Sequence, residues 1–296
     1  TLVAMEILGK KTKVKGDSTN SYYRYEAMVR RLLTLVGLWP SENSVWSYYI
    51  RIYFILFLMT VNLAGIINHV LHDVSTTQEI IVVVSFLTTT LMTVLKICLI
   101  TINRKEVSEI YKKLQKLLCT AEQEGRLIDY AFERGDMCYI LVQTYTIVAF
   151  VSFFGFAIPF LLELIREIRD PTILKFQLIY PARYPWDPRS NRLVFIGTYT
   201  MEMMMMFSVC VTVPGIDGFV LLLICQGVIN LRAMAYQLKN IEKSEDHEEV
   251  MKKCVQNWIF TTHLRDEVQR IYGPLIIFSV VTGTLLVCTV MHQLAR

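Results

Sequence analysis

Side chains able to do acid–base, nucleophilic or metal chemistry are spread thinly along this sequence of 296 residues. The five histidines form no His-x-x-x-His pair, and the seven cysteines form no Cys-x-x-Cys spacing of the kind that binds zinc. No glycine-rich phosphate loop and no nucleophile-elbow sequence accompanies the serines and aspartates. The sequence therefore predicts no enzyme, no metal and no cofactor, and it favours binding over catalysis.

Aromatic and methionine side chains, by contrast, are concentrated in three apolar stretches. A methionine-lined surface adapts to varied apolar ligands, because the thioether is flexible and polarizable. Aromatic walls with a few hydroxyls suit a small volatile or lipid-like molecule, although such residues also pack helices together or contact lipid. The candidate ligand-binding residues are Phe86, Tyr145, Phe150, Phe153, Phe154, Tyr199, Met203 and Met206.

Five apolar stretches must position these side chains, and each approaches the length of a bilayer span. A hydrocarbon core about 30 Å thick needs about 20 apolar residues in a helix that rises about 1.5 Å per residue. Lipid cannot satisfy backbone polar groups, so these segments must be helical. We predict an all-α integral membrane protein with five recognisable transmembrane helices, at residues 46–71, 80–102, 140–162, 193–231 and 271–291.

Basic residues predict the orientation of these helices. Twenty Lys and Arg residues fall in the amino-terminal segment and the alternate loops on one side, against six on the other. Because basic loops stay in the cytoplasm, we expect a cytoplasmic amino terminus. The expected organisation is a cytoplasmic segment over 1–45, four transmembrane helices over 46–231, a cytoplasmic helical connection over 232–265 and a fifth transmembrane helix over 266–296.

Composition excludes several other classes of protein. Hydrophobic residues make up 53% of the chain and charged residues only 19%, against about 25% charged in soluble domains. The basic residues lie in loops between spans, which argues against nucleic acid as a partner and for the lipid bilayer. The outward connections contain no cysteine, so no extracellular disulfide is expected.

Several segments need a structural interpretation beyond hydropathy. Residues 22–40 form either an amphipathic helix on the membrane surface or a helix packed on its neighbours. For residues 193–231, we favour one long helix kinked at Pro214 over two spans. Asp217 is either paired with a neighbouring backbone group or Lys, which we favour, or part of a switch. Lys96 suits the cytoplasmic edge of the second span, and residues 180–188 are rich in proline and should form an ordered cap.

Helical extensions are expected on the cytoplasmic side. Apolar residues recur at three- and four-residue spacing within 103–134, which indicates that the second span continues below the membrane. Together with residues 232–265, such extensions would pack into an intracellular bundle, where subunits can meet; the alternative is a set of solvated faces. The candidate subunit contacts are Val250, Cys254 and Trp258.

Four motifs occur in order between residues 25 and 291. They are residues 31–40 before the first span, residues 184–188 before the fourth span, Asp217 with residues 221–223, Gln226 and Leu231 in the fourth span, and His263, Phe278 and Cys288 in or before the fifth. Together they resemble the insect odorant receptor family, of the kind common in hymenopteran insects, and the expected cytoplasmic amino terminus agrees with this resemblance.

This resemblance implies the odorant-binding subunit of a ligand-gated, non-selective cation channel in the plasma membrane of olfactory sensory neurons. It implies a small volatile or apolar odorant as ligand. It also implies a hetero-tetramer with the odorant receptor coreceptor, in which the subunits contact one another through the cytoplasmic part of the fold, the intracellular anchor. The family has seven spans, so we expect a carboxy-terminally incomplete chain that lacks the sixth and seventh. An insect gustatory receptor and a fragment of a G-protein-coupled receptor are the alternatives.

Overall fold

The computed structural model describes residues 21–40, 46–73, 76–122, 135–169, 178–188, 190–241 and 247–294. Every regular element within those residues is a helix, which confirms the all-α prediction. Residues 21–36 form the first described helix. The helices that follow it are α2 (Trp46–His72), α3 (Thr77–Ile102), α4 (Arg104–Glu122), α6 (Gly135–Arg169), α7 (Arg192–Lys239) and α8 (His247–Leu294).

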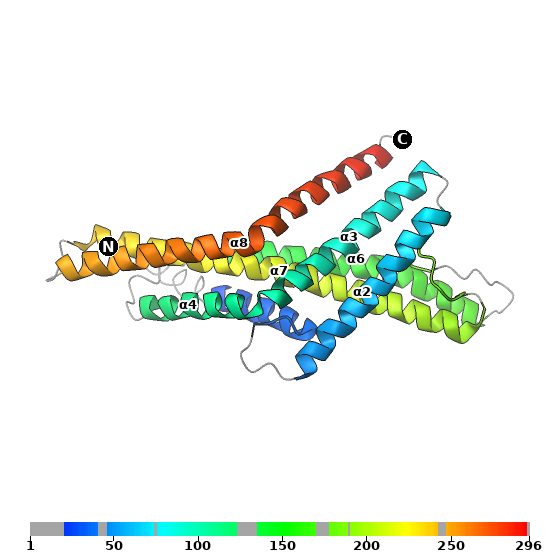
Figure 1. Cartoon of the computed structure of the whole chain (residues 1–296), viewed down its shortest axis with the longest axis horizontal. Coiled ribbons are helices and arrows are strands. Elements are labelled where there is room, and N and C mark those ends of the chain that lie inside the picture. Colours follow the sequence, from blue (N-terminus) through cyan, green and yellow to red (C-terminus); the bar gives the residue numbers. More distant parts are fainter. Residues whose placement is uncertain are drawn as a thin grey trace, which may run out of the picture.

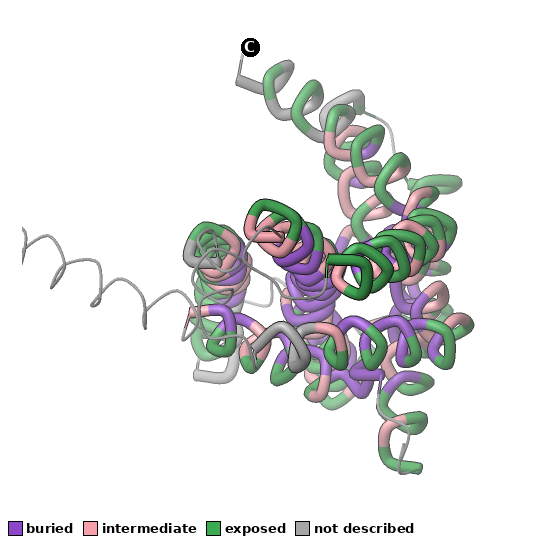
Figure 2. Tube along the Cα trace, turned by 90° about the vertical axis from the view of Figure 1, so that its left-hand side faces the viewer, coloured by how far each residue is buried: buried purple, intermediate pink, exposed green. Residues whose placement is uncertain are grey.

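The central helix of the bundle is α7. It contacts α2, α3, α4, α6 and α8, and its buried residues run from Phe195 to Met234. Figure 1 shows α6 and the first part of α8 lying along α7, whereas α2, α3 and the last part of α8 are inclined to it. In Figure 2 the buried residues occupy the inward sides of the helices and the exposed residues the outward sides.

Four of the described helices are long and apolar enough to cross a membrane. They are α2, α3 from Glu79, α6 over Met137–Pro159, and α7. Large apolar side chains such as Phe57, Val151 and Ile277 are exposed on the bundle, as expected where lipid is the solvent. The fifth predicted span lies in the last part of α8, but the described residues of α8 do not add a fifth helix to this set.

Residues 193–231 belong to one continuous helix, as favoured from the sequence. Helix α7 passes through Pro214 and ends only at Lys239, so the alternative of two spans joined by a turn is wrong. The Asn191 side chain caps the start of α7 by accepting a hydrogen bond from the Leu193 backbone N–H at 3.2 Å. One helix therefore runs without a break from Arg192 to Lys239.

Residues 21–36 are built into the bundle rather than laid on its surface. The Tyr22 and Tyr25 side chains are 1% and 0% exposed. The Tyr25 hydroxyl donates to the Gly218 carbonyl, and the Gln226 amide donates to the Tyr22 hydroxyl at 2.8 Å. Of the two sequence interpretations, the helix packed on its neighbours is therefore the correct one.

Helix α4 follows α3 directly, after an interruption at Asn103, the residue that caps α3. Its apolar residues Val107, Ile110 and Leu114 are buried, and α4 contacts α7. Glu106 of α4 also pairs with Arg270 of α8, with 2.7 Å between the guanidinium nitrogen and the carboxylate oxygen. The helical extension predicted after the second span is thus present over Arg104–Glu122, where it packs on α7 and forms an ion pair with α8; the rest of the predicted range, 123–134, lies outside the described residues.

Candidate functional site

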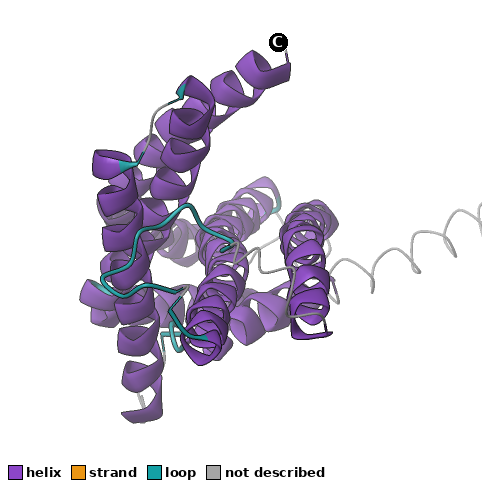
Figure 3. Ribbon diagram, turned by 90° about the vertical axis from the view of Figure 1, so that its right-hand side faces the viewer, coloured by secondary structure: helices purple, strands orange, loops and turns teal. Residues whose placement is uncertain are grey.

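A capping loop, residues 178–188, closes one end of the bundle, and a buried carboxylate holds it there. The loop has no regular secondary structure, and Figure 3 shows it passing in front of the helices. The Glu202 side chain of α7 is 0% exposed. Its carboxylate accepts hydrogen bonds from the backbone N–H groups of Ile179 at 2.8 Å and Tyr180 at 3.4 Å. The ordered cap predicted from the prolines is therefore present.

Tyr184 ties the capping loop to two helices. Its hydroxyl donates to Glu202 at 2.7 Å and accepts a hydrogen bond from the Asn62 amide of α2 at 2.9 Å. Burial and the nearby Glu202 charge raise the pKa of Tyr184 above its ordinary value, so the phenol keeps its proton and remains a donor. A Cβ on Gly65 would lie 3.2 Å from the Tyr184 ring, so glycine here allows α2 to approach the loop closely.

Aromatic rings from α3, α6, α7 and the capping loop pack edge to face near this end. The Phe86 ring of α3 lies against Tyr180 of the loop, with 5.0 Å between centroids. On α6, Phe153 and Phe150 both pack on Phe207 of α7, at 5.8 Å and 6.3 Å. Three of the predicted ligand-binding residues therefore make aromatic contacts between elements, and Phe207 joins two of them.

The predicted residues on α7 share one face of that helix. Tyr199, Met203 and Met206 are separated by four and three residues, which is the spacing of a helix face. Tyr199 is 4% exposed and Met206 8%, and Met203 is half-buried against the core. We call Phe86, Phe150, Phe153, Tyr199, Met203, Met206 and Phe207 the aromatic–methionine cluster.

Two predicted residues lie differently. Phe154 contacts Phe153 at 5.3 Å, but 54% of its own surface is exposed on the outside of α6, where it fits lipid contact. Tyr145 precedes Phe153 by eight residues, about 12 Å along α6. Its phenol interacts with the Asp217 carboxylate of α7. Sequence spacing alone could not separate these positions from the cluster, because it does not show which face of α6 meets α7.

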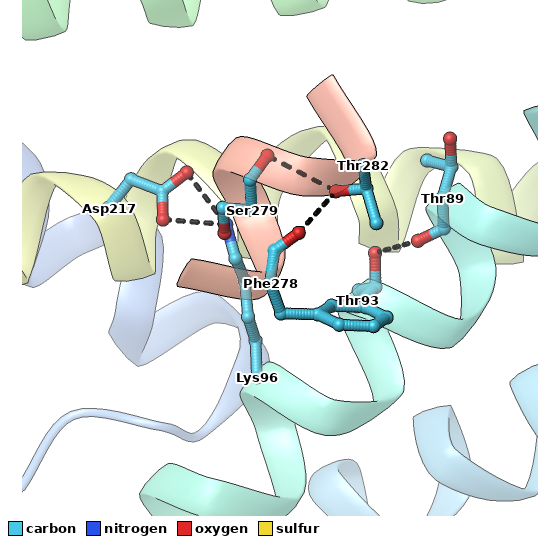
Figure 4. A network of polar contacts seen from close by, with 7 residues as sticks. All are labelled: Thr89, Thr93, Lys96, Asp217, Phe278, Ser279 and Thr282. Carbon is cyan, nitrogen blue, oxygen red and sulfur yellow. Dashed lines mark hydrogen bonds and ion pairs between the residues drawn. The ribbon is translucent and has the colours of Figure 1, made fainter. Parts of the chain in front are cut away.

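A partly buried ion pair joins α3 to α7 at the level of Tyr145. The Lys96 ammonium donates to both oxygens of Asp217, at 2.6 Å and 2.8 Å (Figure 4). Lys96 is only 4% exposed, so its side chain points into the bundle, and its place at the cytoplasmic edge of the span stays a prediction. Asp217 is paired with a lysine, as favoured from the sequence. A charge on a membrane helix that is withdrawn from water is costly unless it is paired, which accounts for the partner.

The three predicted subunit contacts differ in exposure. Trp258 is 59% exposed, and Val250 is half-buried. Cys254 is 4% exposed, and its thiol faces Gln237 of α7, with 3.7 Å from sulfur to amide oxygen. Cys254 therefore packs within the chain, and Trp258 is the member of the three that a partner can reach.

An apolar cavity that the sequence did not predict lies between α4, α7 and α8. Its volume is about 360 Å³, and apolar side chains make up most of its wall. It lies further along α7 than Asp217, on the side away from the capping loop. The residues that line it include Leu114, Val220, Leu223, Ile224, Leu231, Trp258, Leu264, Val268 and Ile276.

The fold and these contacts define a class: a helical membrane protein with an apolar, capped cluster at one end of its bundle. The comparisons identify the family. The family model described as 7tm Odorant receptor matches residues 76–296, and the chain belongs to that family. The match favours the odorant receptor over both alternatives left open by the sequence, and it agrees with the expectation that the protein is not an enzyme. No curated protein matches the chain.

Solved structures show the same fold. The insect olfactory receptor OR5 from Machilis hrabei is similar to 93% of this chain and 72% of its own, with a TM-score of 0.71 and 14% sequence identity. The same receptor in complex with eugenol is similar to 95% of this chain and 73% of its own, with the same TM-score and identity. At this identity the likeness shows the fold alone.

Proposed function

We propose that this chain is the odorant-binding subunit of a ligand-gated, non-selective cation channel that works with the odorant receptor coreceptor. The observation that carries the proposal is the aromatic–methionine cluster, which lies under a fixed capping loop among helices apolar enough to span a membrane. Family membership supports a receptor role in the sense of smell, in the plasma membrane of olfactory sensory neurons.

The ligand in this proposal is a small apolar odorant held by the cluster. Aromatic rings and thioethers provide polarizable contacts without charge, and the surrounding helices exclude water from the site. The Machilis hrabei receptor of the same fold has been solved in complex with eugenol, which supports odorant binding by this architecture. The binding residues we assign are Phe86, Phe150, Phe153, Tyr199, Met203 and Met206.

The coreceptor in this proposal contacts the first part of α8, beyond the predicted spans. Trp258 is exposed there beside Val255 and Ile259, which are 50% and 63% exposed. Apolar side chains grouped on a surface outside lipid are typical of a protein interface. A hetero-tetramer joined through this part of the chain would bury them. Trp258→Ser should then weaken copurification with the coreceptor, while Lys253→Ser on the same helix should not.

Whole-cell recording tests the proposal directly. We expect odorant-evoked cation currents in cells that express the full-length receptor with the coreceptor, and none in cells that express either subunit alone and are given the same odorant. Strong G-protein signalling by the receptor without the coreceptor would overturn the proposal. The absence of any evoked current with a broad odorant panel, when both subunits are at the cell surface, would also overturn it.

A further inference from the structure

The Tyr199 hydroxyl has no hydrogen-bond partner within the described structure. Its oxygen is inaccessible to solvent, and the residue is only 4% exposed. Buried polar atoms are normally paired with protein, with an ordered water or with a ligand, because an unpaired one loses its hydration and gains nothing. The hydroxyl therefore needs a partner from outside the described structure.

Neighbouring polar groups at the same end of α7 are already occupied. Each Glu202 oxygen accepts hydrogen bonds from the capping loop: one from the Tyr184 hydroxyl, the other from two backbone N–H groups. The Thr198 hydroxyl accepts from the Trp186 indole at 2.9 Å and donates to the Val194 carbonyl. These groups are committed to holding the loop in place.

The surroundings of Tyr199 otherwise belong to the apolar cluster. Met203 and Met206 follow it on the same face of α7, and Phe195 packs against its ring at 6.3 Å. Thioethers and aliphatic groups are at best weak hydrogen-bond acceptors.

Two other buried hydroxyls are unpaired among the described residues, but neither belongs to the aromatic–methionine cluster. Thr212 follows Tyr199 by thirteen residues, about 20 Å further along α7. Tyr272 is on α8, two residues before Pro274. Tyr199 is thus the unpaired hydroxyl that coincides with the assigned ligand-binding residues.

We propose that this receptor selects oxygenated odorants: apolar volatiles with a single acceptor oxygen, which receives the hydrogen bond from the Tyr199 hydroxyl. This inference rests on the proposed function. A phenol with an ordinary pKa near 10 is protonated at neutral pH and is available to donate. An analogue that lacks the oxygen leaves the Tyr199 hydroxyl unpaired. A ligand with several polar groups buries some of those groups without a hydrogen-bond partner. Both are therefore disfavoured.

The test compares acetophenone with ethylbenzene, which has a methylene group in place of the carbonyl. Binding is measured on the chain in lipid nanodiscs as displacement of a fluorescent naphthylamine probe. We expect acetophenone to bind about tenfold more tightly than ethylbenzene, the size of one net hydrogen bond. Tyr199→Phe should remove this preference by weakening acetophenone alone. Tyr272→Phe, which also removes an unpaired buried hydroxyl, should leave it intact.

The outcomes separate the two proposals. Equal displacement by both compounds, unchanged in Tyr199→Phe, overturns the inference and leaves an odorant-binding receptor without this selectivity. Displacement by neither compound, together with no odorant-evoked current from the full-length receptor and coreceptor, overturns both. A fall in melting temperature of the unliganded Tyr199→Phe protein would mean that the hydroxyl is paired within the protein, which also contradicts the inference.

Discussion

The Lys96 ammonium reaches across from α3 to both carboxylate oxygens of Asp217 on α7, at 2.6 Å and 2.8 Å. These residues are 121 positions apart in the sequence. The pair connects the helix that carries Phe86 with the helix that carries Tyr199, and the Tyr145 phenol of α6 interacts with the same carboxylate. Three helices that contribute to the cluster are thus linked through one carboxylate.

Removing one partner of this ion pair should cost more than removing both. Asp217→Asn leaves Lys96 buried and unpaired, and we expect a loss of about 3 kcal/mol, the low end of the range for buried pairs because Asp217 is partly exposed. The double variant Lys96→Met, Asp217→Asn should recover most of that loss. Chemical unfolding in bicelles measures both. Equal stability of the single and double variants would mean that the pair does not hold α3 to α7.

Two glycines of α7 should respond oppositely to the same substitution. A Cβ on Gly218 would lie 3.0 Å from Val29 and 3.1 Å from Val142, whereas nothing lies within 4 Å of one on Gly197. Gly218→Leu should therefore cost about 1–3 kcal/mol by forcing residues 21–36 away from α7. Gly197→Leu should leave stability unchanged or raise it, because leucine is the better helix former.

Thermal unfolding followed by tryptophan fluorescence compares the two glycine variants. If Gly218→Leu has the same melting temperature as the wild type, residues 21–36 do not pack against α7 as described.

The capping loop should loosen when its buried anchor is lost. Tyr184→Phe removes the donor to Glu202 and the acceptor for Asn62, so we expect amide hydrogen exchange at Ile179 and Tyr180 to rise about tenfold. Arg183→Ala is the control, since it removes only an exposed ion pair with Asp73 at 3.3 Å. A larger effect from Arg183→Ala would show that surface contacts hold the loop.

Substitutions in the aromatic–methionine cluster should change ligand selectivity without preventing assembly. Met203→Trp fills space on the ligand face of α7, and Phe153→Ala opens space on α6, so the first should reject larger odorants and the second admit them. Phe154→Ala is the control, because Phe154 is 54% exposed on the outside of α6. Concentration–response curves for a graded odorant series give the result. Unchanged responses in both cluster variants would place the ligand elsewhere.

Hydropathy and spacing predicted the helices well, because length and apolar content alone determine whether a segment can cross a bilayer. The continuity of α7 through Pro214 was predicted too, since a membrane helix tolerates proline when neighbours satisfy the freed backbone group. The amphipathic pattern of residues 22–40 could not choose between surface and interior. The choice is decided by contacts between residues far apart in the sequence: Tyr25 with Gly218, and Tyr22 with Gln226.

The sequence named aromatic and methionine residues as candidates for the site. It could not show how far along each helix they lie or which neighbouring helix they face. Tyr145 and Phe153 are both aromatic residues of α6, yet only the packing of α6 on α7 shows that one meets Asp217 and the other Phe207. The sequence did not identify Lys96 as the partner of Asp217, because the two residues are 121 positions apart. The burial of Cys254 and the cavity between α7 and α8 likewise arise from contacts between elements.

Photolabelling with benzophenone, an acetophenone analogue that carries its own reactive carbonyl, tests the location of the odorant site most directly. Labelled protein in nanodiscs is digested, and the modified residues are identified by mass spectrometry, with excess acetophenone as competitor. The account predicts competed labels on Met203, Met206 or Phe153, beneath the capping loop. Competed labels confined to Leu223, Trp258 or Val268, around the cavity between α7 and α8, would contradict it.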